Sequence, residues 1–416
     1  MSVASALVQS RGDRLPAYSL FAAALAAAGL PIYIHAPKFY VDTYGVSLAA
    51  LGTALFLLRL IDVVQDPFFG WLSERLRQHR AAAVACAAFV MGIAMFGLFA
   101  VTPPVAPLFW FALTLTLMFS GYSFLSINFY AQGVQKADSL GDNGHIRLAG
   151  WRETGALLGV CAAAVAPTLL ASVEAGPFAV FATGFAAVLL IAVWAMRTEW
   201  QIDAHLPSGA LHPILGDPVA RQLLMIALVN ATPVAISSTL FLFFVESRIG
   251  VPGLEGPLLL TFFLAAALSA PLWSVAARRH GTKKTLIFGM VLSIVSFAFT
   301  AMLGTGDALA FAVICLASGA ALGADMTLLP AIFAGRMARI APSAAQAFGL
   351  WSFVTKFTLA FAAVLLLPTL DAAGFVAGTE NTTDALWTLT VLYAVVPCAL
   401  KLVAIALLMA TPLEES

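Results

Sequence analysis

The strongest candidate for chemistry is a group of ionisable side chains inside an apolar segment. Arg59, Asp62 and Asp66 follow Leu48–Leu58, a run without any charged residue. Their spacings of three and four residues place them on one stripe of a helix. Because ionisable groups at membrane depth are costly, they usually face the interior of a helix bundle or a water-filled cavity. The sequence therefore predicts a buried polar site on this helix.

Oxygen atoms dominate the predicted site. Gln65 lies between the two carboxylates, and Pro67 has no N–H to donate to the carbonyl of Val63. Carboxylate, amide and carbonyl oxygens suit a hard cation such as Na⁺. Two nearby carboxylates also repel each other, so one tends to hold a proton or recruit a cation. The alternative is that Asp62 and Asp66 pair with Arg or Lys side chains on neighbouring helices.

Composition indicates an all-α integral membrane protein. Of the 416 residues, 61% are hydrophobic and 10% are charged, whereas soluble domains are about one quarter charged. The formal net charge of zero gives no reason to expect a nucleic-acid partner. The four cysteines lie in apolar runs without a CxxC spacing, so we expect them to form neither a disulfide framework nor a metal site.

Apolar runs of about 20 residues, the length that crosses a bilayer, recur along the chain. About twelve such spans are predicted, near residues 16–40, 48–72, 81–101, 106–133, 147–171, 177–197, 220–246, 256–277, 284–304, 308–335, 345–369 and 385–411. A polar central loop, 198–218, separates an N-terminal six-helix half, 1–197, from a C-terminal six-helix half, 219–416. Two such halves are typical of a pseudo-symmetric transporter with its site between them.

Basic residues are distributed unequally between the two predicted sides of the membrane. One side collects most of them, whereas the other carries only Lys38 and Arg248. Because Lys and Arg are enriched in cytoplasmic loops, both termini and the central loop are predicted to be cytoplasmic, in a multi-pass protein of the plasma or inner membrane. A cytoplasmic gate is predicted from basic residues in corresponding loops of the two halves: Arg75, Arg278, Arg279 and Lys283.

Two further charged residues lie inside predicted spans of the C-terminal half. Lys356 stands in a span otherwise free of charge and needs a carboxylate partner, for which Asp62 and Asp66 are candidates. The alternative is that the Lys356 stem extends to the membrane interface. Asp325, a carboxylate in mid-span, is predicted to contact substrate or to join a charge network with Arg59 and Lys356.

Arg59–Arg75 resembles the helix-two motif of the glycoside–pentoside–hexuronide cation symporters, the melibiose permease-like branch of the major facilitator superfamily. The resemblance continues along nearly the whole chain, in Tyr122–Tyr130, Arg147–Glu153, Pro271–Lys284, Gly323–Pro330 and Gly349–Lys356. It implies the major facilitator fold and alternating access, and it matches Lys356 to a helix-eleven lysine near the cation site. That implied cation site consists of Asp62, Gln65, Asp66 and Ser123.

The same resemblance bears on the substrate. In the sugar-transporting relatives, acidic residues on helices one and four hold the sugar hydroxyls, and Ala26 and Ser126 stand at those positions here. Because sugar hydroxyls lose water on entry and need partners, an amphiphilic, anionic or aromatic ligand is expected instead of a plain disaccharide. Arg152 matches a family arginine that helps to bind substrate; the alternative is an ion pair with Glu153. The predicted substrate-binding positions are Tyr122, Ser126, Asn128, Tyr130, Arg152, Glu153 and Ala26.

These features predict a secondary active transporter that couples a small organic solute to Na⁺ or H⁺ in symport. The alternatives are a proton-coupled exporter, a carrier of lysolipids or other amphiphiles, and a non-transporting assembly or sensor protein of transporter fold. No HExxH, Gly-x-Ser-x-Gly or P-loop motif occurs, so neither an enzyme nor an ATP-driven pump is expected. We expect no cofactor besides the coupling ion, and a monomer surrounded by membrane lipid.

Overall fold

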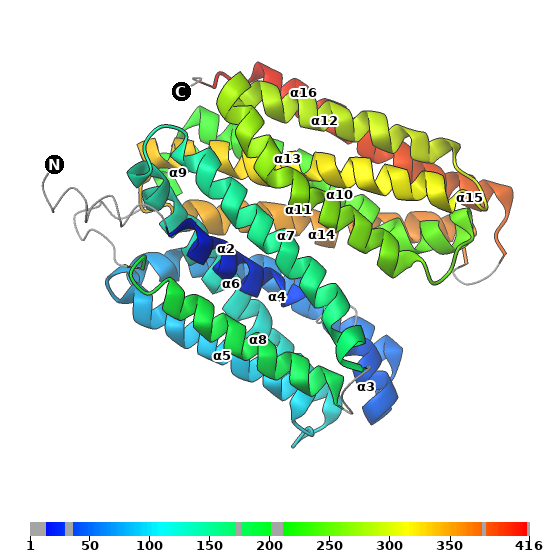
Figure 1. The fold of residues 1–416 in the computed structure, drawn as a ribbon. Coiled ribbons are helices and arrows are strands. Elements are labelled where there is room, and N and C mark those ends of the chain that lie inside the picture. Colours follow the sequence, from blue (N-terminus) through cyan, green and yellow to red (C-terminus); the bar gives the residue numbers. More distant parts are fainter. Residues whose placement is uncertain (1–13, 30–35, 172–175, 201–210, 377–379, 414–416) are drawn as a thin grey trace, which may run out of the picture. The chain divides into compact units, whose positions relative to one another are not determined.

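The computed structural model describes residues 14–29, 36–171, 176–200, 211–376 and 380–413 (Figure 1). Every regular element in these ranges is a helix, as predicted for an all-α membrane protein. Contacts between residues divide the chain into two compact units, which we call unit 1 and unit 2. Unit 1 comprises Met1–Pro213 with Met337–Phe353, and unit 2 comprises Ile214–Arg336 with Val354–Ser416.

Four helices of unit 1 start where the sequence supplies a side-chain cap or a proline. They are α2 (Leu15–Ala26), α3 (Ala36–Tyr44), α4 (Leu48–Arg75), α5 (Arg80–Ala100), α6 (Pro107–Ser139), α7 (Gly144–Ala171) and α8 (Pro177–Ala195), with a 3₁₀ turn at Arg77–His79. The hydroxyl of Ser47 accepts a hydrogen bond from the N–H of Ala50 and caps α4. Proline stands in the first turn of α2, α6 and α8, where its missing N–H costs nothing.

The helices after the short α9 (Leu211–Gly216) lie mostly in unit 2, although residues 337–340 and 345–353 of two of them belong to unit 1. Two of these helices continue into π-helical turns. The elements are α10 (Pro218–Phe243), η3 (Phe244–Ile249), α11 (Glu255–His280), α12 (Thr282–Ala298), η4 (Phe299–Met302), α13 (Ala308–Ile340), α14 (Ala345–Ala372), α15 (Thr383–Thr390), η5 (Val391–Val395) and α16 (Val396–Ala410). The predicted span 220–246 is therefore α10 with part of η3. The predicted span 385–411 is α15, η5 and α16 in succession.

Nine helices in the described part of the chain are long and apolar enough to cross a membrane. Two others, α4 and α7, have 28 residues each, but charged residues interrupt their apolar runs. α2 is shorter, with 12 residues, and residues 30–35 beyond it lie outside the described ranges. These three additional helices account for the remainder of the twelve spans predicted from the sequence.

Glycines allow two pairs of helices to approach backbone to backbone. In unit 1, a Cβ on Gly155 or Gly159 of α7 would lie 2.1 Å from the carbonyl oxygen of Ser19 or 2.2 Å from that of Ala23, both on α2. In unit 2, a Cβ on Gly319 of α13 would lie 2.2 Å from the carbonyl oxygen of a residue on α11. Small residues four apart are the usual means of close helix packing in membranes.

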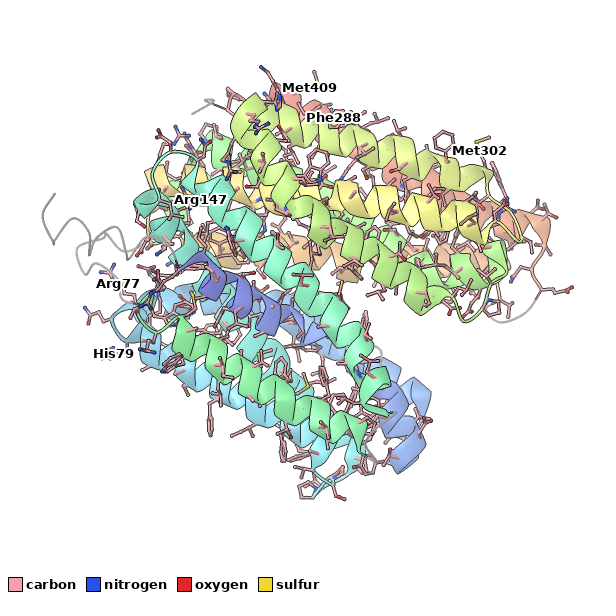
Figure 2. The ribbon with its side chains drawn as sticks, in the orientation of Figure 1. Arg77, His79, Arg147, Phe288, Met302 and Met409 are labelled. Carbon is pink, nitrogen blue, oxygen red and sulfur yellow. The ribbon has the colours of Figure 1, made fainter. Side chains whose placement is uncertain are left out.

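Large apolar side chains also cover outward-facing positions of unit 2. Phe288, Met302 and Met409 are 63%, 79% and 63% exposed, and they project from the outer helices of this unit (Figure 2). In unit 1, Arg77, His79 and Arg147 lie toward one end of the helices in the same view. Apolar side surfaces and polar helix ends are what a bilayer requires of a helical protein.

Asp217 fixes the start of α10, just before the apolar span Pro218–Ile249. Its Oδ1 accepts hydrogen bonds from the N–H of Ala220 at 2.7 Å and from Arg336 Nε at 3.1 Å, and Arg336 Nη2 donates to Oδ2. The carboxylate therefore caps a helix and forms a bidentate ion pair with α13. The hydrogen bonds from Arg336 hold the pKa of Asp217 below its ordinary value.

Asp217→Asn is expected to lower the free energy of unfolding by about 1–2 kcal/mol at pH 7, because asparagine keeps the helix cap but loses the ion pair. Since the folded-state pKa of Asp217 is lowered, the ion pair contributes above the unfolded-state pKa of about 4. Its contribution is lost as the pH falls through the folded-state pKa. Equilibrium unfolding in detergent at pH 7 and at about pH 3 should show the difference from wild type shrinking in acid. A difference independent of pH would contradict the prediction.

Candidate functional site

The predicted cation site is assembled from α4 and α6 of unit 1. Asp62 is 7% exposed and Asp66 is fully buried. Ser123 Oγ donates to Asp62 Oδ1 at 3.0 Å, and Gln65 Nε2 donates to the same oxygen at 2.9 Å. The structure thus brings Asp62, Gln65 and Ser123 together, with Asp66 one turn further along α4. Its chemistry is that of a buried carboxyl group that accepts hydrogen bonds from an amide and a hydroxyl group.

Ser120 is a fourth member of this group that was not predicted from the sequence. Its hydroxyl donates to Gln65 Oε1 at 2.9 Å, so it orients the amide whose Nε2 contacts Asp62. The sequence did contain an indication of this role, because Ser120 precedes Ser123 by three residues and so shares its face of α6. Hydrogen bonds therefore connect Ser120 on α6 to Gln65 and Asp62 on α4. Asp62 in turn accepts a hydrogen bond from Ser123 on α6.

The remaining predicted partners of this site are Arg59 and Lys356. Arg59 is half-buried on α4 of unit 1, and Lys356 is half-buried on the part of α14 that belongs to unit 2. The pairing of Lys356 with Asp62 or Asp66 would join residues of different units and stays a prediction. Within the described ranges, no three His, Cys, Asp or Glu side chains gather in the manner of a metal centre.

A second polar cluster joins α6 and α7 inside unit 1. Arg152 Nε donates to Glu153 Oε1 at 2.7 Å, and the hydroxyl of Tyr130 donates to the same oxygen at 3.1 Å. The Arg152 guanidinium also lies 3.9 Å above the Tyr130 ring centroid. We call these three residues the Arg152 cluster. The ion pair considered for Arg152 and Glu153 is present, yet Arg152 Nη2 is buried without a hydrogen-bond partner among the described residues. One N–H-bearing nitrogen therefore remains to bind an acceptor.

The other predicted substrate positions are Asn128, Ser126, Tyr122 and Ala26. Asn128 is 1% exposed; its Nδ2 donates to the carbonyl of Phe124 at 2.8 Å, and its Oδ1 accepts from Ser73 Oγ at 2.7 Å. Both ends of this amide are thus used in packing α6 and fastening it to α4. The hydroxyl of Ser126 donates to a backbone carbonyl, whereas Tyr122 and Ala26 are half-buried.

Unit 2 contains a buried ion pair around Asp325, the remaining predicted charge. Lys401 Nζ on α16 donates to Asp325 Oδ2 on α13 and, at 2.7 Å, to Asn230 Oδ1 on α10. Neither Lys401 nor Asn230 was predicted from the sequence. Lys401 carried the same signal as Lys356, because it is the one charged residue in the predicted span 385–411. Asp325 therefore pairs with Lys401, and its predicted network with Arg59 and Lys356 stays a prediction.

The predicted gate residues have local contacts. The guanidinium of Arg75 lies 4.3 Å from the ring centroid of Trp71, one turn earlier on α4. Lys283 Nζ donates to the carbonyls of Met409 at 3.0 Å and Thr411 at 2.8 Å, and so caps the end of α16. Arg278 and Arg279 are exposed in the last turn of α11.

Comparisons with known proteins identify the family of this chain. The chain resembles the crystal structure of a bacterial homologue of the iron transporter ferroportin in its outward-facing state. The TM-score is 0.68 with 13% identity, over 96% of this chain and 98% of that one. No curated protein matches the chain. A family model described as MFS/sugar transport protein matches residues 16–415, and this family holds the melibiose permease-like symporters predicted from the sequence. The chain therefore belongs to the MFS/sugar transport protein family and is a multi-pass membrane transporter of the major facilitator fold.

Proposed function

We propose that this transporter is a symporter that couples a small organic solute to a cation bound at Asp62, Gln65, Asp66 and Ser123. The observation that carries the proposal is the buried Asp62 carboxylate, held by Gln65 and Ser123 from two helices. A buried carboxyl group surrounded by further oxygen atoms can bind a cation or a proton. Neutral amide and hydroxyl oxygens around one carboxylate suit Na⁺, and a proton is the other coupling ion.

The coupling mechanism follows from this charge balance. A bound cation removes one unit of negative charge from the site, and this lowers the cost of closing the transport pathway around the solute. The halves then rock around the site and give alternating access. We propose both termini on the cytoplasmic side of the plasma or inner membrane, and a monomer as the working form, as the distribution of basic residues and the family fold suggest.

For the substrate, the Arg152 cluster supports an anionic or aromatic solute. Arg152 Nη2 offers hydrogen bonds to an anion, while the Tyr130 ring supplies an apolar surface. A plain sugar is less suited, because Ala26 and Ser126 stand where acidic groups would hold its hydroxyls. A carrier of lysolipids or other amphiphiles and a proton-coupled exporter remain alternatives, since the same groups fit their headgroups or anions.

Na⁺ is expected to stabilise the wild-type protein against unfolding, and Asp62→Asn and Asp66→Asn are expected to remove this effect. A cation present at about 100 times its dissociation constant should add roughly 2.7 kcal/mol. The experiment compares thermal unfolding of the detergent-purified chain in Na⁺, Li⁺ and choline at several pH values. Asp384→Asn is the matched control, because Asp384 is exposed at the start of α15.

Each outcome has a defined meaning. Stabilisation by Na⁺ that is lost in Asp62→Asn but kept in Asp384→Asn supports sodium symport. If thermal stability depends on pH but not on Na⁺, and the same variants abolish this dependence, the result supports proton coupling. A proton-coupled exporter then becomes the preferred alternative. If neither ions nor pH distinguish Asp62→Asn from the wild type, the cation-coupling proposal is wrong and a non-transporting role must be considered.

A further inference from the structure

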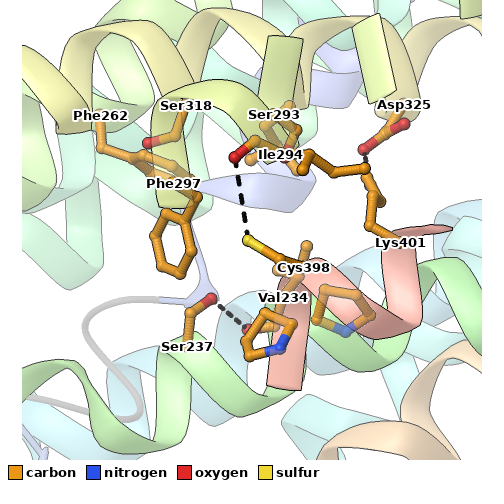
Figure 3. Close-up of a pocket in the computed structure, with 13 residues that line it drawn as sticks. Val234, Ser237, Phe262, Ser293, Ile294, Phe297, Ser318, Asp325, Cys398 and Lys401 are labelled. Atoms are coloured by element: carbon orange, nitrogen blue, oxygen red, sulfur yellow. Dashed lines mark hydrogen bonds and ion pairs between the residues drawn. The ribbon is translucent and has the colours of Figure 1, made fainter. Parts of the chain in front are cut away.

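A small pocket, mostly apolar but with several polar groups in its wall, lies inside unit 2 next to the Asp325–Lys401 ion pair (Figure 3). Residues of α10, α11, α12, α13 and α16 line it. Its free volume is about 50 Å³, and about 10–15 Å³ of such space suffices for one water molecule. The pocket is therefore large enough for a few waters and too small for an organic solute, which usually needs several hundred Å³.

Asp325 presents one oxygen atom that the ion pair does not use. The residue is 7% exposed, and Lys401, at 3% exposed, donates to its Oδ2. Asp325 Oδ1 is buried and has no hydrogen-bond partner among the described residues. An unsatisfied carboxylate oxygen in a low-dielectric interior is unfavourable unless a donor reaches it. Because Asp325 lines the pocket, a water molecule there can donate a hydrogen bond to Oδ1, or Oδ1 can itself bind a proton.

The rest of the pocket wall can hold such water. The hydroxyl-bearing residues Ser237, Ser293 and Ser318 line it from three different helices (Figure 3). Pro233 of α10 also lines it, and has no N–H to donate to the carbonyl of Val229, next to Asn230 in the chain. Buried waters typically make about three hydrogen bonds to polar groups of this kind.

We propose that Asp325 is a proton-binding site within unit 2, supplied by water in this pocket and separate from the cation site of unit 1. A proton from the surrounding solution passes along the pocket water to Oδ1 and leaves no hydroxide behind, while Oδ2 continues to accept the hydrogen bond from Lys401. The charge of the pair changes from zero to plus one, and no contact between heavy atoms has to break. A metal cation does not fit here, because the ammonium group of Lys401 already occupies the other oxygen and would repel it.

The titratable groups that face the pocket are few. Among the lining residues they are Asp325 on α13 with Lys401 and Cys398 on α16, whereas α10, α11 and α12 contribute none. Cys398 Sγ donates a weak hydrogen bond to the carbonyl of Ile294 at 3.8 Å. A protonation event in this pocket therefore belongs to the Asp325–Lys401 pair. This inference does not depend on the proposed function of the Asp62 site.

Infrared pH-difference spectroscopy of the detergent-purified full chain tests the proposal. The wild type should gain the C=O stretching band of a buried, deuterium-sensitive carboxylic acid as the pH falls between about 8 and 4. Asp325→Asn should lose this band, whereas Asp62→Asn should keep it. Lys401→Gln should move the midpoint of the band to higher pH by at least about one unit, because the nearby positive charge that opposes protonation is gone.

The outcomes that overturn the proposal are equally specific. The proposal is wrong if the wild type shows no pH-dependent C=O band of a buried carboxylic acid. It is also wrong if folded Asp325→Asn shows this band unchanged. If that single variant does not fold, Asp325→Asn/Lys401→Gln removes both charges together and must lose the same band. A midpoint in Lys401→Gln equal to that of the wild type would also overturn it, because a purely structural lysine would leave the band unmoved.

Discussion

Lys401→Met is expected to destabilise the protein by about 3–5 kcal/mol, the usual cost of leaving a buried charge without its partner. The variant removes the donor to both Asp325 and Asn230, so the carboxylate of Asp325 remains in an apolar helix interior. The loss should appear in equilibrium unfolding in detergent, measured at neutral pH. Lys284→Met is the matched control, because Lys284 is exposed at the start of α12.

The double variant Asp325→Asn/Lys401→Met separates this cause from simple loss of packing. With both charges removed, no uncompensated charge is buried, and the asparagine that replaces Asp325 carries an amide that can pair with Asn230. Replacing both members of a buried ion pair is often nearly neutral, so its stability should return to within about 1–2 kcal/mol of the wild type. If the double variant is as unstable as Lys401→Met, the cost arises from the shape of Lys401 and not from its charge.

Gly159→Leu is expected to cost about 3 kcal/mol, the upper end of the range for overpacking. Even the first carbon of the new side chain would lie 2.2 Å from the carbonyl oxygen of Ala23 and 2.7 Å from its Cα. These are backbone atoms of α2, so the clash is relieved only by moving one helix away from the other. Separation of the two helices would also expose the contacts that surround Gly155, the neighbouring small position.

Gly184→Leu provides the control for this prediction. Gly184 is exposed on α8, and among the described residues no atom outside its chain neighbours and the nearby α8 backbone lies within 4 Å of the position its Cβ would take. Leucine has a better helix propensity than glycine, so the control should be neutral or stabilising by about 0.5–1 kcal/mol. The two variants can be compared by thermal unfolding in the same detergent. An equal loss in both would mean that α2 and α7 tolerate separation.

The membrane class and the site on α4 were predictable because both rest on strong local signals. Long apolar runs leave few alternatives to membrane helices, and Asp62 and Gln65 are so close in sequence that one helix positions both. Ser123 depended on the resemblance to known symporters, since its approach to Asp62 joins different helices. Residue spacing also indicated that Asp62 and Asp66 share one stripe of α4.

The parts that could not be predicted depend on which face of an apolar helix turns inward. Helices such as α6 and α13 are apolar on all sides, so their sequences do not reveal that Asn128 fastens α6 to α4. For the same reason the sequence did not identify Lys401 as the partner of Asp325, since the two residues are 76 positions apart. The π-helical turn η5 was not predictable either, since a change from four-residue to five-residue hydrogen bonding leaves no clear sequence pattern.

The charges on α4 also constrain how the chain enters the membrane during synthesis. Placing one Asp or Arg at the centre of a bilayer helix costs about 2.5–3.5 kcal/mol at the translocon, and α4 carries Arg59, Asp62 and Asp66. The hydroxyls that stabilise Asp62 and Gln65 lie on α6, which leaves the ribosome only after α4 and α5. The nascent α4 is therefore expected to wait beside the translocon until α6 arrives. The polar contacts of the mature transporter would then also set the order in which its first helices reach lipid.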